Sequence, residues 1–188
     1  YDDFIGKPFM TKITESEIET FAIKLLEKEG FQYIYAPDIA PDSENPIRQS
    51  FDEVILKNNL SLAVNRINPN IPNISIDEGI KQILRLKSSD LITNNETFHR
   101  MLTEGIKVNI KKNGQDRGDL VWLIDFKNPE NNNFIVSNQF AITENGINKR
   151  PDVILFINGL PLVIIELKNP ADEKTTIKSA FKQIDTYK

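Results

Sequence analysis

The sequence predicts an α/β fold in which helices flank a central, mainly antiparallel or mixed β-sheet. Three observations indicate this class. The first half of the 188 residues carries helix-start signals, each followed by apolar residues at helical spacing. After Gly105 the apolar residues follow the shorter period of strands, and near the C-terminal end the helical spacing returns. Because the strands are grouped between helices, the helices are expected to cover the sheet.

The first predicted helix begins at a capping box, Thr14-Glu-Ser-Glu17, whose side chains satisfy N–H groups that the first turn leaves unpaired. Apolar residues follow at helical spacing over residues 18–26, and Gly30 stands where a left-handed residue ends a helix. On a helical wheel, Glu15 and Glu19 lie one turn apart beside or within this apolar stripe. We therefore expect one of these two carboxylates to enter the interior.

Three more helices are predicted before the strands begin. Capping boxes at Ser50-Phe-Asp-Glu53 and Ser75-Ile-Asp-Glu78 each precede an apolar pattern at helical spacing, which predicts a helix at each box. Asn68-Pro-Asn-Ile-Pro-Asn73 is typical of the loop between them. A further helix is expected over residues 94–104, ended by Gly105.

Five segments rich in Val, Ile and Phe are predicted as strands of the sheet. Turn clusters that contain Asn-Gly separate several of them, and a last helix places four apolar residues on one face. The predicted strands span residues 106–111, 119–126, 134–143, 151–157 and 160–168, and the apolar residues of the last helix are Ile177, Ala180, Phe181 and Ile184.

Composition excludes several classes of protein. With 39% hydrophobic and 27% charged residues, the chain is neither disordered nor a coiled coil. Its longest apolar stretch is shorter than the roughly 20 residues that a bilayer crossing needs, so no membrane segment is predicted. There is no Cys and no leader pattern at the start of the sequence, so a reducing cytoplasm is expected. A net charge of −4 means that any nucleic-acid contact must use a local basic face.

Three charged residues stand at the ends of two very apolar strands. Asp152 opens the first strand, Asn158-Gly159 turns the chain, and Glu166 and Lys168 close the returning strand. A carboxylate beside such buried strands is costly unless it is paired or coordinates a metal. Two hard oxygen ligands suit Mg²⁺, and the lysine could orient water or neutralise developing charge in phosphodiester hydrolysis. A salt bridge at the strand ends is the simpler alternative.

The register of this hairpin is a specific expectation. A regular two-residue turn would pair Asp152 with Ile165, and Asp152 and Glu166 would then point to opposite faces of the sheet. A shared metal site forbids that arrangement. We therefore expect a three-residue loop with Gly159 in the left-handed region, or a β-bulge, that brings both carboxylates to one face.

Longer runs of sequence resemble a known family. Asp152 followed by Glu166-x-Lys168 resembles the PD-(D/E)xK nuclease motif, and residues 150–170 resemble the amino-terminal nuclease domain of the type I restriction enzyme R (motor) subunit. This resemblance implies a restriction-endonuclease-like core with extra helices in its first half. It covers most of a single domain over residues 1–188, outside a helical insertion at 36–95. Further matching runs are residues 14–19, 98–105, 123–126, 138–140 and Gln183-x-x-x-Tyr187.

The resemblance implies a Mg²⁺-dependent endonuclease of a type I restriction-modification system that cuts double-stranded DNA. Asp152, Glu166 and Lys168 would form its catalytic centre, with both acids as metal ligands, and Gln183 and Tyr187 would support it. ATP would bind only to a translocase elsewhere in the subunit, because no phosphate-binding Gly-Lys-Ser/Thr loop occurs here. Specificity and methyltransferase subunits would be the partners.

Other candidate residues carry weaker signals. Glu19 is a candidate catalytic acid with Glu15 as its rival, although an acid in a first turn also suits the helix dipole. Lys178 and Lys182, which continue a stripe from Lys174, are candidates for DNA-backbone contact or a solvated face. The single histidine, His99, is expected to be inert.

Two alternatives from other functional classes stay open. One is a catalytically silent DNA-end-binding module on the same fold, for which loss of one of the three charged residues would be the sign. The other is a repair or recombination nuclease with the same motif. The chain starts at Tyr1, and no Gly or Pro stops the helical pattern before Lys188, so it is expected to be a fragment of a longer protein.

Overall fold

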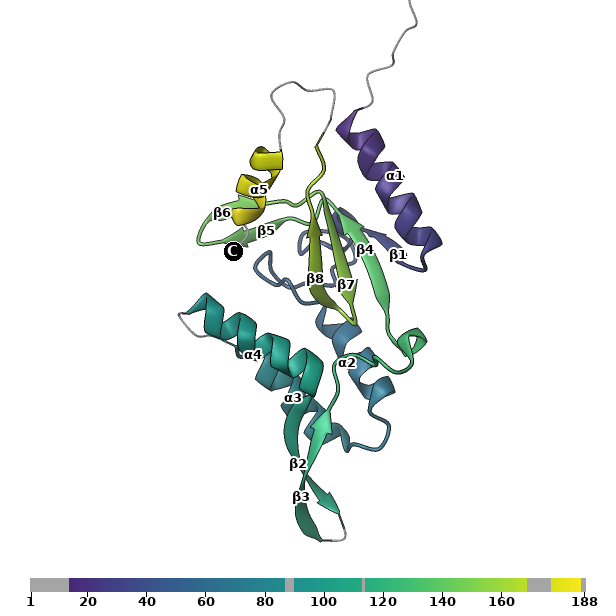
Figure 1. Cartoon of the computed structure of the whole chain (residues 1–188), viewed down its shortest axis with the longest axis vertical. Helices are drawn as coiled ribbons and strands as arrows, with labels where there is room; N and C mark the ends of the chain where they lie inside the picture. Colours follow the sequence, from purple (N-terminus) through teal and green to yellow (C-terminus); the bar gives the residue numbers. More distant parts are fainter. Residues whose placement is uncertain (1–13, 87–89, 113, 169–176, 187–188) are drawn as a thin grey trace, which may run out of the picture.

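A four-stranded mixed sheet forms one end of the molecule, and a long two-stranded hairpin forms the other (Figure 1). This computed structural model describes residues 14–86, 90–112, 114–168 and 177–186. The helices are α1 (Glu15–Lys28), η1 (Ala36–Ile39), α2 (Lys57–Ile67), α3 (Asn73–Leu84), α4 (Leu91–Glu104), η2 (Pro129–Asn131) and α5 (Ile177–Asp185). The strands are β1 (Gln32–Tyr35), β2 (Ile106–Lys112), β3 (Gln115–Val121), β4 (Phe134–Asn138), β5 (Ile142–Glu144), β6 (Ile147–Lys149), β7 (Val153–Ile157) and β8 (Leu160–Ile165).

Helix α1 begins and ends where the sequence predicts. The Thr14 hydroxyl accepts a hydrogen bond from the Glu17 N–H at 3.2 Å, and the Glu17 carboxylate accepts one from the Thr14 N–H at 2.7 Å. These bonds lower the pKa of Glu17. At the other end, Gly30 has a φ of 97°, and the Phe31 N–H donates to the Leu26 carbonyl at 3.0 Å. Both cap predictions are confirmed.

The prediction of a helix beginning at Ser50 is wrong. Residues 50–53 form a turn, in which the Glu53 carboxylate accepts from the Gln49 N–H at 2.8 Å and also binds the Lys57 ammonium. Helix α2 starts only at Lys57 and has no side-chain cap. Its start is anchored from elsewhere, because the Leu56 N–H donates to the Gly159 carbonyl at 2.9 Å. A tertiary contact therefore replaces the local signal.

The helices predicted at α3 and α4 are both present, and each starts earlier than predicted, α4 at Leu91 rather than at residue 94. Helix α3 begins at Asn73, so Ser75 is not its cap; the buried Ser75 hydroxyl instead donates to the Asn109 carbonyl of β2 at 2.9 Å. Helix α4 begins after Asp90, whose carboxylate accepts from the Ile92 N–H, and it ends at Gly105 with a φ of 78°.

The main sheet has the order β1-β4-β7-β8. Strand β1 pairs in parallel with β4, while β4–β7 and β7–β8 are antiparallel, so the sheet is mixed. The α/β class is confirmed. Strand β1 was not predicted, because its four residues carry no alternating pattern of buried and exposed side chains.

Four predicted strands are shorter than expected, and two of them belong partly to other sheets. Strand β7 begins at Val153 rather than at residue 151, and β8 ends at Ile165, so Glu166 and Lys168 follow the strand rather than belong to it. The strand expected at 134–143 is interrupted at Gln139, whose φ of 57° breaks extended structure, and it continues in β5. The strand expected at 119–126 ends at Val121 and pairs only with β2. Strands β2–β3 and β5–β6 thus form separate two-stranded sheets.

The β7–β8 hairpin contains the expected bulge. Near the turn Ile157 pairs with Leu160 and Phe156 with Pro161, whereas beyond it Leu155 pairs with Val163 and Val153 with Ile165. Leu162 is the extra residue on β8. The predicted bulge is confirmed. Continuing the shifted register beyond Val153 and Ile165 would place Asp152 opposite Glu166, on one face of the sheet.

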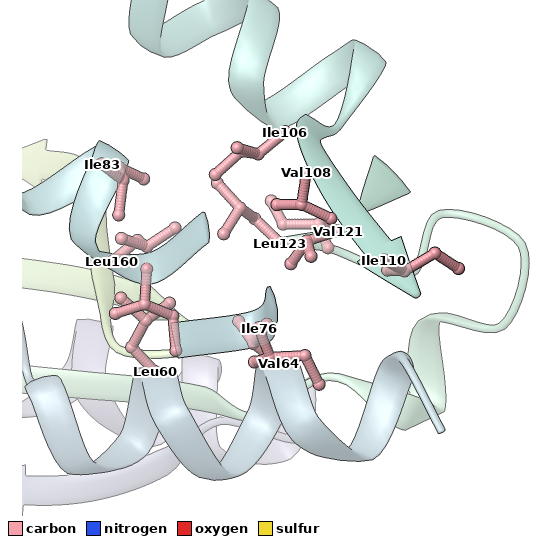
Figure 2. Close-up of a cluster of buried hydrophobic side chains, with 12 residues drawn as sticks. Leu60, Val64, Ile76, Ile83, Ile106, Val108, Ile110, Val121, Leu123 and Leu160 are labelled. Carbon is pink, nitrogen blue, oxygen red and sulfur yellow. The ribbon is translucent and has the colours of Figure 1, made fainter. Parts of the chain in front are cut away.

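The buried side chains form two main groups. One lies between α2, α3 and the β2–β3 hairpin and also includes Leu160 from the turn of the β7–β8 hairpin (Figure 2). The other packs on the main sheet around Phe140 and Phe156, whose ring centroids are 5.3 Å apart. Leu160 thus joins the sheet to the helices below it. No helix in the described ranges is both long and apolar enough to cross a membrane.

Candidate active site

The candidate site lies at one edge of the main sheet. Asn138 at the end of β4 pairs with Val153 at the start of β7, and Val153 pairs with Ile165 at the end of β8. Residues that flank these three positions therefore meet at a single edge. Asp152 and Glu166 are the immediate neighbours of this row.

Asp152 is half-buried and links the ends of the two strands. One of its carboxylate oxygens, Oδ2, accepts a hydrogen bond from the backbone N–H of Leu167 at 2.7 Å. This bond ties the start of β7 to the residues that follow β8. It holds the carboxylate beside the Glu166-Leu-Lys168 segment.

Glu166 is the most deeply buried charged group of the site. Its side chain is 0% exposed, and the Lys168 ammonium lies 3.9 Å from its Oε2, within ion-pair distance but too far for a hydrogen bond. A buried carboxylate costs several kcal/mol in desolvation, and nearby positive charge offsets part of that cost. A buried carboxylate is also the kind of ligand that a hard divalent cation prefers.

Lys168 connects the site to helix α5. Its ammonium donates to the Gln183 side-chain carbonyl at 2.9 Å, and its side chain is 25% exposed. The structure thus brings Gln183 to the predicted lysine. Tyr187 and Lys174 lie outside the described residues, while Lys178 and Lys182 are exposed on α5.

Glu19, rather than Glu15, faces the sheet edge. Its carboxylate accepts hydrogen bonds from the side-chain amides of Asn138 at 2.5 Å and Gln139 at 3.4 Å. Glu15 is exposed. The side-chain carbonyl oxygen of Asn138, Oδ1, in turn accepts from the Tyr33 hydroxyl at 2.9 Å, and burial raises the pKa of Tyr33. A chain of polar groups therefore joins β1, β4 and α1 beside the two strand-end acids.

The donor set fits a hard divalent cation that keeps most of its own waters. Asp152 and Glu166 offer carboxylate oxygens from neighbouring strand ends, and Mg²⁺ is commonly bound by one or two carboxylates. No group of three His, Cys, Asp or Glu side chains suited to a metal occurs among the described residues. In this arrangement side-chain amides hold the Glu19 carboxylate.

Sequence reasoning missed the residues that orient Glu19. Asn138 and Gln139 were noticed only within a longer matching run, and no role was assigned to them. Tyr33 gave no signal, because it lies on the unpredicted strand β1. The available sign in the sequence was the polar pair Asn138-Gln139 at the end of an apolar strand.

The chain is similar to known proteins of one family over nearly its whole length. A family model described as "Type I restriction enzyme R protein N terminus" matches residues 12–188. The chain is 35% identical over 177 residues to the type I restriction enzyme HindI endonuclease subunit of Haemophilus influenzae, which covers 94% of this chain and 17% of that protein. It is 34% identical over 190 residues to the putative type I restriction enzyme MjaIXP endonuclease subunit of Methanocaldococcus jannaschii, covering 97% and 18% respectively. The chain thus spans less than a fifth of these relatives.

Proposed function

Since the chain belongs to the family of type I restriction enzyme R protein N termini, we propose that it is a metal-dependent endonuclease domain that hydrolyses phosphodiester bonds of double-stranded DNA. The observation that carries the proposal is the bulge-shifted register of β7 and β8. Continued by one residue, this register would set Asp152 opposite Glu166, and the Lys168 ammonium lies within ion-pair distance of Glu166. Two acids and a lysine at the ends of neighbouring strands would form a centre for phosphodiester hydrolysis.

Asp152 and Glu166 would hold Mg²⁺, which when bound activates water and stabilises charge on the phosphate oxygens. The protein supplies the orientation. The Leu167 N–H fixes the Asp152 carboxylate, and Gln183 fixes the Lys168 ammonium. Lys168 then places a positive charge where the attacked phosphate becomes more negative, and its remaining N–H groups can orient the attacking water.

Glu19 would act from the next position on the edge. Its two amide partners hold the carboxylate at the end of β4. In this role Glu19 accepts a proton or orients water beside the metal ligands rather than binding the metal directly.

DNA and the other subunits belong to the same proposal. Lys178 and Lys182 on α5 stand on the helix that Gln183 ties to the site, so they can meet the phosphate backbone near it. In the intact enzyme, a translocase outside these 188 residues would use ATP, and specificity and methyltransferase subunits would be partners. The cytoplasm is the proposed compartment.

A silent DNA-end-binding module is the contrasting function. It would bind DNA through the same fold without cutting it. All three charged residues are present and lie at one edge, which favours the nuclease. The family match favours a restriction enzyme over a repair nuclease.

Substitution of the proposed ligands tests the nuclease function. Asp152→Asn and Glu166→Gln in the intact enzyme should each abolish cleavage of duplex DNA, while ATP hydrolysis and the circular dichroism spectrum stay close to wild type. Calorimetric titration with Mg²⁺ should show a site that both variants lose. Asp77→Asn, an exposed acid on α3, serves as the matched control and should change neither. Cleavage that persists in Asp152→Asn would refute the assignment.

A further inference from the structure

A buried arginine, Arg48, lies outside the candidate site. Arg48 is 2% exposed, although it lies in the irregular segment between η1 and α2. Its guanidinium carbon is 3.8 Å from the centre of the Phe140 ring and 5.7 Å from that of Phe51. This degree of burial is unusual for an arginine in a loop, whose charge is normally in contact with water.

The protein supplies hydrogen-bond acceptors for only some of the N–H groups of the Arg48 guanidinium. Its Nη1 donates to the carbonyls of Glu53 and Ala141, and its Nη2 donates to that of Ala141, each at 3.1 Å. Its Nε–H is buried without an acceptor. Arg48 forms no ion pair with any residue of the described ranges. Burial lowers its pKa, opposed by the nearby Glu53, but a guanidinium stays charged at neutral pH. The interior thus holds a positive charge without a counter-charge in contact, which is costly.

A pocket of about 220 Å³ lies beside Arg48 and carries a second arginine. Arg48 and the exposed Arg150 both line it, with Asp42 as its one lining acid among the described residues. Neither Arg150 nor Asp42 forms a hydrogen bond or ion pair within the described structure. Two guanidinium groups against one carboxylate give the pocket an excess positive charge. Guanidinium groups match the geometry of phosphate oxygens.

The pocket opens at the same sheet edge as the candidate active site. Tyr35 and Gln139, which also line it, stand at and just beyond the ends of β1 and β4, and Gln139 donates to Glu19. Arg150 and Asp152 are separated by one residue, so their Cα atoms are at most about 7 Å apart. Because a DNA strand has one phosphate per 3.4 Å along the helix axis, a strand with one phosphate at Asp152 has neighbours within this reach.

We propose that Arg48 and Arg150 form a phosphate-binding pocket that holds the DNA backbone next to the scissile phosphate. This inference rests on the proposed nuclease function and adds a DNA contact to it. Arg150 meets the phosphate directly from the rim. Arg48 supplies a fixed positive charge from the buried wall of the pocket. The aromatic rings beside it exclude water, so its electric field is screened less than that of a surface arginine. Asp42 opposes binding from the rim.

Duplex binding by single-charge variants tests the pocket, with Ca²⁺ in place of Mg²⁺ so that no cleavage interferes. Fluorescence anisotropy of a labelled duplex is measured over a range of salt concentrations. Arg150→Gln should weaken binding several-fold and reduce the slope of log K against log salt by about 0.9, the value for one lost phosphate contact. Asp42→Asn should strengthen binding. Unchanged affinity in both variants would overturn the proposal.

Two matched controls come from the β2–β3 hairpin, at the far end of the molecule (Figure 1). Arg117→Gln and Asp116→Asn, both exposed on β3, make the same charge changes and should leave the affinity close to wild type. Equal effects at both ends would show that only net charge matters and would overturn the pocket. Arg48→Met tests the buried charge, with its circular dichroism spectrum as the folding check, and Arg150→Gln decides the matter if that variant does not fold.

Inorganic phosphate distinguishes the source of the anion. At matched ionic strength, phosphate should raise the melting temperature of the wild-type protein more than chloride does, and Arg150→Gln should lose that difference. Stabilisation by phosphate together with wild-type DNA affinity in Arg150→Gln would overturn DNA as the occupant. Binding is measured without cleavage, so the outcome is separate from that of Asp152→Asn. If the protein binds DNA through the pocket but never cuts it, the nuclease function is refuted, and only the phosphate-binding role of Arg48 and Arg150 is retained.

Discussion

Val153 and Ile165 face each other across β7 and β8, one register step out of line with the Ile157–Leu160 pair beside the turn. The extra residue, Leu162, is responsible. Without it, Glu166 would lie on the opposite face from Asp152. The position of a single aliphatic residue therefore decides whether the two acids can share a metal.

Deletion of Leu162 tests this relationship. The shortened strand should pair regularly with β7, and Glu166 should move to the face that Ile165 now occupies. We expect cleavage of duplex DNA and the calorimetric Mg²⁺ signal to be lost. Leu162→Ala is the matched control, because it keeps the backbone length; it should retain cleavage and lose only about 1–2 kcal/mol in urea unfolding for a partly buried side chain. Full activity in the deletion variant would show that the register does not matter.

Asn138→Ala tests the group that orients Glu19. The substitution removes the closer of the two amides that hold the Glu19 carboxylate, at 2.5 Å. Partners of this kind typically contribute 10- to 100-fold to metal affinity or activity, so we expect cleavage to fall by about 10-fold or more while DNA affinity in Ca²⁺ is unchanged. Tyr33→Phe removes only the more distant hydrogen bond and should have a smaller effect. Equal losses in both variants would contradict the proposed order of contacts.

Gly159→Ala should destabilise the fold strongly. Gly159 has a φ of 80°, and a Cβ there would lie 2.5 Å from the Leu56 carbonyl oxygen and 2.8 Å from the Leu60 nitrogen. Backbone strain and overpacking together predict a loss of about 3 kcal/mol or more in the free energy of unfolding. Gly146→Ala provides the control, since its φ is 76° but no atom lies within 4 Å of a Cβ. It should lose only about 1 kcal/mol in the same urea titration.

Stability should decrease in acid partly through Glu53. The Lys57 ammonium and the Gln49 N–H hold the pKa of Glu53 below its usual range. A carboxyl with a depressed folded-state pKa stabilises the protein above its unfolded pKa of about 4.3, and this contribution is lost as pH falls through the folded value. Glu53→Gln should therefore flatten the dependence of unfolding free energy on pH below about 5. An unchanged acid limb of the curve would show that Glu53 does not contribute.

The sequence predicted the features that depend on neighbouring residues. The Thr14 cap, the Gly30 and Gly105 helix ends and the bulged β7–β8 hairpin follow from local hydrogen-bonding patterns or from the needs of one pair of carboxylates. The family resemblance is confirmed by the match over residues 12–188. The roles of Asp152, Glu166 and Lys168 remain predictions.

Features that depend on distant parts of the chain were missed. Strand β1 exists because β4 offers a parallel edge, and nothing in Gln32-Tyr-Ile-Tyr35 shows that partner. The Ser50 box resembled a helix start, but Gly159 selects Leu56 as the anchor of α2 instead. Arg48 becomes distinctive only when the fold buries it against Phe140. In each case a tertiary contact decides between local alternatives.

The β7–β8 hairpin is fastened at both of its ends. At the turn, Gly159 is held against the start of α2, and at the open end the Asp152 carboxylate is held by Leu167. Because both ends are held, the length of the hairpin sets the distance between helix α2 and the candidate active site. This length is therefore as constrained as the identity of the proposed catalytic residues. Natural changes in chain length should be confined to segments outside residues 152–167, and the surrounding loops can lengthen without moving the acids.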